Sequence, residues 1–157
     1  MMSRIPSRNS SKNTKSLSPT AGQRLIKLAG CVITDEQGSV LLLHRNNGKH
    51  LHWEIPGGKI DTGETAEQAA IREIKEELDV SVAIQKKFGE KIFKMDDGTP
   101  MHHTWFSAKI TKGEPKVTEP DTFDGLRYFS VPEMAKIRDQ LSHSATNLLI
   151  VLEAAQA

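Results

Sequence analysis

The 157-residue sequence predicts a single α/β domain, a sandwich of helices around a mixed β-sheet. Three observations support this class: β-rich runs occur in mixed order around at least two helical segments, no internal repeat is visible, and the length suffices for one hydrophobic core. We expect the domain to span residues 23–157, after a tail of residues 1–22.

The tail is rich in Ser, Lys and Arg, has few large apolar residues and contains no acidic residue. Such a segment buries too little apolar surface to offset its ordering entropy, so we predict that it is disordered. It lacks the apolar stretch of a secretory signal. Its composition loosely suits an organellar transit peptide, but the amphipathic apolar face is missing.

The overall composition excludes several classes of protein. A net charge of +1 argues against a dedicated nucleic-acid or membrane-surface protein, which would show a basic excess. Cys31 is the only cysteine, which rules out an intramolecular disulfide and a thiolate metal cluster. No apolar run approaches the roughly 20 residues that span a bilayer. We therefore expect a soluble cytoplasmic protein, with the choice between monomer and homodimer open.

The expected elements follow one another from about Leu28. Residues 28–35 and 39–45 are β-rich and are joined by the turn "DEQG", which predicts a hairpin. A loop then leads into "WEIPGG", and a helix follows. The remaining predictions are strands at 80–95, 101–110 and 125–131, loops at 96–100 and 111–124, and helical segments at 132–141 and 145–157.

The first helix is predicted in most detail. Thr65 and Gln68 have the spacing of a capping box, so the helix is expected over 66–78. At about 100° per residue, Ile71, Ile74 and Leu78 form a core-facing stripe, and the glutamates share a neighbouring acidic face. Those glutamates are Glu73, Glu76 and Glu77.

The charge of this segment has a bland explanation and a functional one. Seven of the residues between 56 and 80 are acidic, and a solvated acidic helix face costs only a few tenths of a kcal/mol. The preceding turn favours function, because Pro56-Gly57-Gly58 and Gly63 permit tight turning and close approach to a ligand. Clustered carboxylates after such a turn are hard oxygen ligands suited to Mg²⁺.

The same stretch resembles the Nudix box, G-x5-E-x7-R-E-U-x-E-E-x-G-U, where U is a bulky aliphatic residue. It has Gly58, Glu64 and then "REIKEELDV" over 72–80, and it departs from the pattern only at Asp79, which replaces a glycine. Asp tolerates the left-handed conformation common just past a helix, so we expect the site to survive. "WEIPGGKI" and "RYFSVPEM" extend the resemblance to about residues 28–155.

The resemblance implies hydrolysis of a nucleoside diphosphate linked to another group X, with Mg²⁺ as cofactor and Mn²⁺ as a possible substitute. It implies metal ligation by Glu73, Glu76 and Glu77 together with the Gly58 carbonyl. Arg72 would hold and orient a catalytic glutamate through paired hydrogen bonds, and Glu64 would brace the loop and the helix. Glu73 is the first choice for general base. Glu119 resembles a further ligand or base of the family, and the alternative is an ordinary exposed loop acid.

"PGGKI" resembles the MutT-type branch, which hydrolyses nucleoside triphosphates, including oxidised guanine nucleotides, to monophosphate and pyrophosphate. Lys59 and Arg45 would then stabilise phosphate charge, or else be ordinary surface cations. Asn147 resembles a purine-reading asparagine, with helix capping as the alternative. Trp53, Trp105 and Phe106 are candidates for base stacking, although core packing is the default.

Other functions are weaker candidates. "MHHTWF" lacks the partners of a zinc site, so His102 and His103 are interpreted as structural or substrate-adjacent. No nucleophile motif supports an acyl-transfer triad. Two alternatives stay open: hydrolysis of a nucleotide sugar or dinucleoside polyphosphate, and a non-catalytic nucleotide-sensing module, although all box carboxylates are present.

Overall fold

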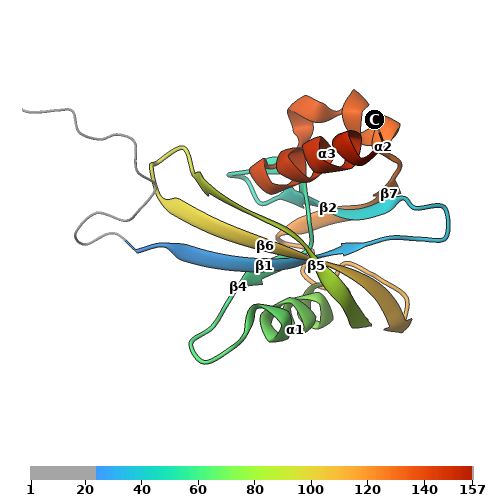
Figure 1. Cartoon of the computed structure of the whole chain (residues 1–157), viewed down its shortest axis with the longest axis horizontal. Coiled ribbons are helices and arrows are strands. Elements are labelled where there is room, and N and C mark those ends of the chain that lie inside the picture. The colour runs from blue at the N-terminus through green and yellow to red at the C-terminus, as the bar shows by residue number, and fades with distance from the viewer. Residues whose placement is uncertain (1–23, 157) are drawn as a thin grey trace, which may run out of the picture.

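The computed structural model describes residues 24–156, which form two β-sheets and three α-helices (Figure 1). The larger sheet has four strands in the order β4-β1-β6-β5. It is mixed, because β1 runs parallel to β6 while the β1–β4 and β5–β6 pairs are antiparallel. Its strands are β1 (Ile26–Ile33), β4 (Gly57–Lys59), β5 (Ser81–Lys94) and β6 (Pro100–Lys112).

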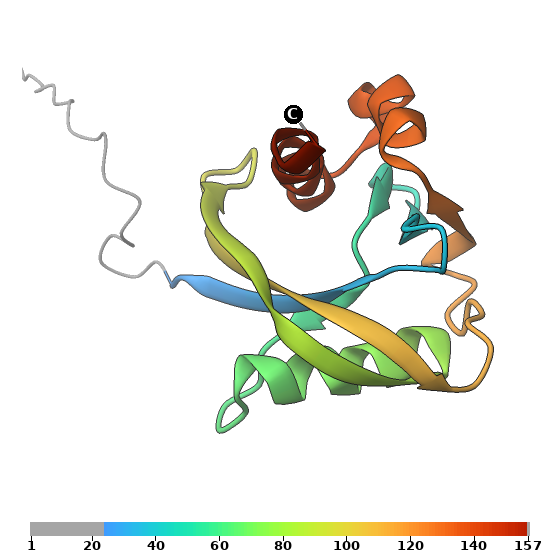
Figure 2. The same ribbon diagram turned by 45° about the vertical axis from the view of Figure 1, so that its right-hand side comes forward.

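The smaller sheet is antiparallel, with the strand order β3-β2-β7. It lies on the same side of the larger sheet as α2 and α3, while α1 covers the opposite face (Figures 1 and 2). The remaining elements are β2 (Val40–Asn46), β3 (Leu51–Glu54), β7 (Phe123–Phe129), α1 (Ala66–Leu78), α2 (Val131–Lys136), a 3₁₀ turn (Arg138–Gln140) and α3 (His143–Gln156). The α/β sandwich with a mixed sheet is confirmed.

The hairpin predicted from residues 28–45 is wrong. The "DEQG" turn forms, with Gly38 N and Ser39 N both donating to Asp35 at 3.0 and 2.9 Å, but the two strands pair only at the bridge between Thr34 and Val40. Beyond the turn, β1 and β2 belong to different sheets. Each strand is central in its own sheet, β1 between β4 and β6 and β2 between β3 and β7, so neither has a free edge for the other. Their runs of consecutive buried residues agree with packing on both faces.

Each face of the larger sheet has its own hydrophobic core. Between this sheet and α1 lie Cys31, Leu43, Ile74, Phe106 and others. On the opposite side, Val32, Trp105, Phe129, Met134 and Leu148 belong to the core beneath α2 and α3. The chain between β3 and β4 therefore passes between two packed regions, and this is where the candidate site lies.

The helix predicted over 132–141 is shorter than expected. It divides into α2 and the 3₁₀ turn at Ile137, whose φ and ψ of −115° and 29° interrupt the helix. A capping box of Ser130 and Glu133 starts α2 at Val131, one residue before the predicted start. No helix within residues 24–156 is long and apolar enough to cross a membrane. The predicted disordered tail, 1–22, lies outside the described residues.

Candidate active site

Helix α1 begins and ends at the residues that the sequence predicts. The Thr65 side chain accepts a hydrogen bond from Gln68 N, and the Gln68 side chain accepts one from Thr65 N, which completes the capping box. At the other end Asp79 adopts the left-handed conformation, with φ 57° and ψ 41°. The one departure from the Nudix pattern thus occupies the conformation for which glycine is usually selected.

The faces of this helix differ from the prediction in two residues. Ile71, expected in the core stripe, is 40% exposed, whereas Glu77, expected on the acidic face, is only 6% exposed. The buried side chains include Ala69 and Ala70, which move the centre of the buried face toward Glu77 and leave Ile71 at its edge. The predicted common acidic face is therefore wrong for Glu77, which points into the protein.

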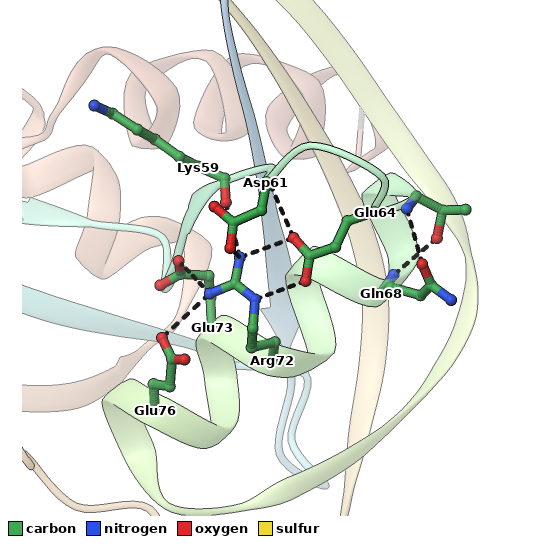
Figure 3. Close-up of polar contacts among 8 residues, drawn as sticks. Lys59, Asp61, Glu64, Gln68, Arg72, Glu73 and Glu76 are labelled. Carbon is green, nitrogen blue, oxygen red and sulfur yellow. Dashed lines mark hydrogen bonds and ion pairs between the residues drawn. The ribbon is translucent and has the colours of Figure 1, made fainter.

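Arg72 is the centre of a charged group that we call the Arg72 cluster, shown in Figure 3. Its guanidinium contacts four carboxylates and one backbone carbonyl. These partners are Asp61 at 3.4 Å, Glu64 at 2.6 and 2.9 Å, Glu73 at 3.0 Å, Glu76 at 3.2 Å and the carbonyl oxygen of Lys59 at 3.0 Å. One cation is therefore shared among four carboxylates, and the cluster keeps a net negative charge.

The expected paired hydrogen bonds from Arg72 to a catalytic glutamate are not formed: the paired bonds go to Glu64, and Glu73 and Glu76 receive one each. Asp61 N also donates to Glu64 at 2.9 Å, so Glu64 joins the loop to the helix. These bonds, led by the one from Arg72, lower the pKa of Glu64 to about 2. Glu64 lies where the resemblance places a bracing residue, and it has the contacts that bracing requires.

The glycine turn lies directly against two carboxylates of α1. A Cβ atom built on Gly58 would lie 2.3 Å from Glu73 Cδ, so any side chain there would displace the Glu73 carboxylate. Gly57 N donates to Glu77 Oε1 at 2.9 Å. A Cβ on Gly57 would lie 2.3 Å from the Ala29 carbonyl oxygen. Gly58 is thus required for the close approach of the turn to α1, and Gly57 for its close approach to β1.

Glu77 is a buried carboxylate with little compensation for its charge. Among the described residues, its side chain has one hydrogen bond, from Gly57 N, and no ion pair. Burial, with nearby Glu54, Glu73 and Glu119, raises its pKa to about 9. Burial also raises the pKa of Glu73, although Arg72 opposes that shift. Without a nearby cation Glu77 therefore keeps its proton at pH 7, whereas Glu73 has Arg72 as a partner.

Glu119 reaches the same area through the loop before β7. Thr118 Oγ1 donates to the Glu77 carbonyl at 3.1 Å and also to the Glu76 carbonyl, and Lys116 N donates to the Leu78 carbonyl at 3.1 Å. These bonds fasten the loop to the C-terminal end of α1. Glu119 itself is exposed, yet it lies near enough to contribute to the raised pKa of Glu77.

A cavity of about 770 Å³ opens on the other side of the glycine turn. Arg45, Gly58, Lys59 and Asn147, four of the predicted site residues, line it together. Arg45 is already paired, because it donates two hydrogen bonds to Glu54 at 2.7 and 3.0 Å. No ion pair of the exposed Lys59 side chain exists within residues 24–156, and this side chain points away from the Arg72 cluster (Figure 3).

Asn147 lies within α3 and does not cap it, so the capping alternative is wrong. The helix begins at His143, and the Ser142 hydroxyl accepts a hydrogen bond from Ala145 N at 3.2 Å. The Asn147 side chain is half-buried at the cavity wall. Its amide can therefore contact a ligand in the cavity.

The aromatic candidates for base stacking pack in the core, as the default reading predicts. Trp105 and Phe106 are 1% and 4% exposed. Trp53 packs edge-on against Phe129, with ring centroids 4.8 Å apart. The two neighbouring histidines separate, since His102 contacts Glu90 at 2.9 Å while the buried His103 lines the cavity.

The donor atoms present suit a hard divalent cation. Among residues 24–156, no three His, Cys, Asp or Glu side chains lie close enough together to hold a metal ion as they stand. Glu73 and Glu76 are turned toward Arg72, and Glu77 toward Gly57. The insufficiently compensated Glu77 and the Glu73 carboxylate beside Gly58 nevertheless provide oxygen donors, which Mg²⁺ prefers.

The structure combines a mixed-sheet sandwich, a glycine turn and a capped acidic helix, and Arg72 joins the helix to the preceding loop. This combination defines a Nudix-type hydrolase domain. The NUDIX domain profile matches residues 25–148, and the chain belongs to the Nudix hydrolase family. Relatives include the 8-oxo-dGTP diphosphatase of Escherichia coli K12, 36% identical over 94 residues that cover 57% of this chain and 70% of that protein.

Solved structures agree with this assignment. A MutT Nudix hydrolase from Burkholderia pseudomallei superposes with a TM-score of 0.71 at 28% identity, covering 81% of this chain and 96% of that one. A Caenorhabditis elegans Ap4A hydrolase gives a TM-score of 0.66 at 26% identity, covering 84% and 98%. In three further curated relatives, the match spans 62%, 55% and 52% of their length.

Three residues of the site were not predicted from the sequence. Glu54 and His52, which contact each other at 2.8 Å, hold Arg45 at the cavity wall, and Thr118 positions the Glu119 loop. Glu54 had a usable signal, because it lies two residues before Pro56 of the glycine turn and shares a strand face with His52. Thr118 had none, since its partners are backbone carbonyls far away in the sequence.

Proposed function

We propose that this protein is a Mg²⁺-dependent pyrophosphohydrolase that cleaves nucleoside triphosphates, including oxidised purine nucleotides, to monophosphate and pyrophosphate. The observation that carries the proposal is the glycine turn. Its one side contacts the Glu73 and Glu77 carboxylates, and its other side lines the cavity with Lys59 and Asn147. A nucleotide in this cavity would thus place its phosphates beside the acidic helix.

The metal would be held by oxygens of Gly58, Glu73, Glu76 and Glu77, with Glu119 as a further ligand. When bound, Mg²⁺ would neutralise the pyrophosphate and favour deprotonation of the attacking water. Glu73 and Glu76 would turn from Arg72 toward the ion, while Glu64 retains its paired bonds to the arginine. Mn²⁺ is expected to substitute, because it accepts the same oxygen donors.

Glu73 is the proposed general base. Burial raises its pKa, which strengthens it as a proton acceptor, and without metal Arg72 Nη1 donates a hydrogen bond to one of its oxygens at 3.0 Å. Water would attack a phosphorus of the anhydride and pass its proton to Glu73, and the bond from that phosphorus to the bridging oxygen would break. Lys59 would offset the charge of the phosphates. Arg45 already donates two hydrogen bonds to Glu54, so it would contact phosphate only through its remaining N–H groups.

The nucleoside would occupy the cavity with its base toward Asn147. An amide can donate to and accept from a purine edge, which suits recognition of guanine and its oxidised form. The substrate of the E. coli relative supports this choice. We retain one second candidate, a dinucleoside polyphosphate, because the C. elegans Ap4A hydrolase shares the fold at 26% identity. Cytoplasmic localisation and the choice between monomer and homodimer stay predictions.

One panel tests the proposal. Purified protein with Mg²⁺ is incubated with normal and oxidised nucleoside triphosphates, nucleotide sugars and dinucleoside polyphosphates, and the products are identified. Monophosphate and pyrophosphate from a triphosphate are expected. Preferential cleavage of a dinucleoside polyphosphate, or of a nucleotide sugar to two monophosphates, would replace the proposed substrate. Binding of nucleotides without any turnover would instead indicate a sensing module.

A further inference from the structure

One buried polar group in the cavity has no role in the chemistry described above. His103, on β6, is 4% exposed and lines the cavity beside Met101. Its neighbour Trp105, two residues along the same strand face, lies in the core beneath α3. The imidazole therefore stands at the boundary between the packed core and the cavity.

The partner of one ring nitrogen fixes the tautomer of His103. Trp105 Nε1 lies 2.8 Å from His103 Nδ1. An indole N–H is only a donor, so Nδ1 must be the acceptor. Burial lowers the pKa of His103 to about 4, and the ring is neutral at pH 7 with its single proton on Nε2. The ring thus presents a donor at Nε2.

Two glycines leave room for this pair of rings. A Cβ on Gly89 would lie 3.1 Å from Trp105 Cε3, so the indole packs directly against β5 at this glycine. A Cβ on Gly30 would lie 3.1 Å from His103 Nε2 and 2.6 Å from the Pro56 carbonyl oxygen. The sheet therefore accommodates the imidazole beside the turn that leads to Gly57.

His103 Nε2 has no hydrogen-bond partner within residues 24–156. A buried N–H almost always has a partner, either in the protein or in a ligand or ordered water. Here the side chain lines the same cavity as Asn147. The ligand expected in that cavity is the most direct source of an acceptor atom.

We infer that His103 determines base specificity by donating a hydrogen bond from Nε2 to a carbonyl oxygen of the nucleobase. The inference rests on the proposed function, in which the cavity holds the nucleoside. A fixed donor matches the carbonyl of a 6-oxopurine. It opposes the exocyclic amine of a 6-aminopurine, because two donors would then face each other. His103 would thus favour oxopurine over aminopurine nucleotides.

The test compares dITP with dATP, two purines that differ in this carbonyl and amine and in the protonation of the adjacent ring nitrogen. His103→Asn keeps an acceptor near the Nδ1 position for Trp105 and removes the donor near Nε2. His103→Gln restores an N–H near Nε2. His102→Asn is the matched control, because its neighbouring side chain contacts Glu90 outside the cavity. Thermal unfolding of each variant verifies that it is folded.

We expect the wild-type ratio of kcat/KM for dITP over dATP to fall roughly tenfold in His103→Asn, mainly through KM for dITP. His103→Gln should recover part of the ratio, and His102→Asn should retain it. An equal change for both substrates, or no change in folded His103→Asn, would overturn the inference. If the wild-type protein hydrolyses no nucleoside triphosphate, the proposed function itself has failed, and the two failures remain distinct.

Discussion

Glu64 and Glu77 belong to the same acidic motif but lie in opposite electrostatic surroundings. Glu64 receives two hydrogen bonds from Arg72 and one from Asp61 N, and its pKa falls to about 2. Glu77 is buried with a single hydrogen bond from Gly57 N, and its pKa rises to about 9. The difference separates a carboxylate whose charge is already compensated from one that lacks a cation.

The contrast indicates that two regions of the motif have different functions, one structural and one in metal binding. The side centred on Arg72 and Glu64 fastens the loop of residues 61–64 to α1 without any further ion. The side centred on Glu77 and Gly57 has carboxylate oxygens but no positive charge. A metal is therefore expected to change the second region strongly and the first region weakly. The experiments below test that division, beginning with the largest expected effect.

Removal of divalent metal should abolish activity. The proposed ligands are oxygens only, and Glu77 has no cationic partner among the described residues, so turnover should disappear in excess EDTA and return with Mg²⁺ or Mn²⁺. Pyrophosphate release is the measurement. Full turnover in chelator, by protein shown to hold no tightly bound metal, would contradict a metal role for the Glu77 region.

Glu76→Gln tests whether a carboxylate that contacts Arg72 in the absence of metal also acts on the metal. The substitution keeps size and helix propensity and removes one charge, so kcat should fall by roughly 10²-fold or more, equivalent to about 2.7 kcal/mol. Stability without metal should change little, because relief of like-charge repulsion offsets the loss of the exposed contact between Glu76 and Arg72.

The control for this experiment is Lys75→Gln. Lys75 pairs with Asp79 at 3.1 Å and makes no contact with the Arg72 cluster. We expect kcat to stay within about threefold of the wild-type value. Small and similar effects from both substitutions would instead support the explanation that this helix face is an ordinary solvated acidic surface.

The sequence predicted the ends of the helix in this site better than the burial of its side chains and the pairing of its strands. The ends of α1, its capping box and the left-handed Asp79 follow from local rules, because neighbouring residues determine them. The burial of Glu77 and the separation of β1 from β2 depend on packing between segments distant in the sequence, which no local pattern specifies. For the same reason the motif indicated Arg72, but not that Glu64 would take its paired bonds.

Glu77→Gln tests the uncompensated region through stability. Gly57 N still finds an acceptor, while the cost of keeping the buried Glu77 carboxyl protonated at pH 7, above its usual pKa, disappears. Metal-free protein should become more stable by about 1–3 kcal/mol at pH 7, as measured by urea unfolding. Added Mg²⁺ should stabilise the wild-type protein more than the variant. A loss of metal-free stability would show that the carboxylate is satisfied by contacts within the protein.

Glu64→Gln tests the compensated region, where the smallest functional effect is expected. The variant weakens the paired bonds to Arg72, so its melting temperature at pH 7 should be lower with or without Mg²⁺, and kcat should change far less than in Glu76→Gln. Because the folded pKa of Glu64 lies below its unfolded value, its contribution is present above about pH 4.5 and is lost as pH falls toward 2. The stability difference from wild type should therefore shrink between those pH values.

Glu67→Gln, which changes an exposed acid in the first turn of the same helix, is the matched control and should show little change. A Glu64→Gln protein that loses its response to Mg²⁺ would place Glu64 on the metal and erase the distinction between the two regions.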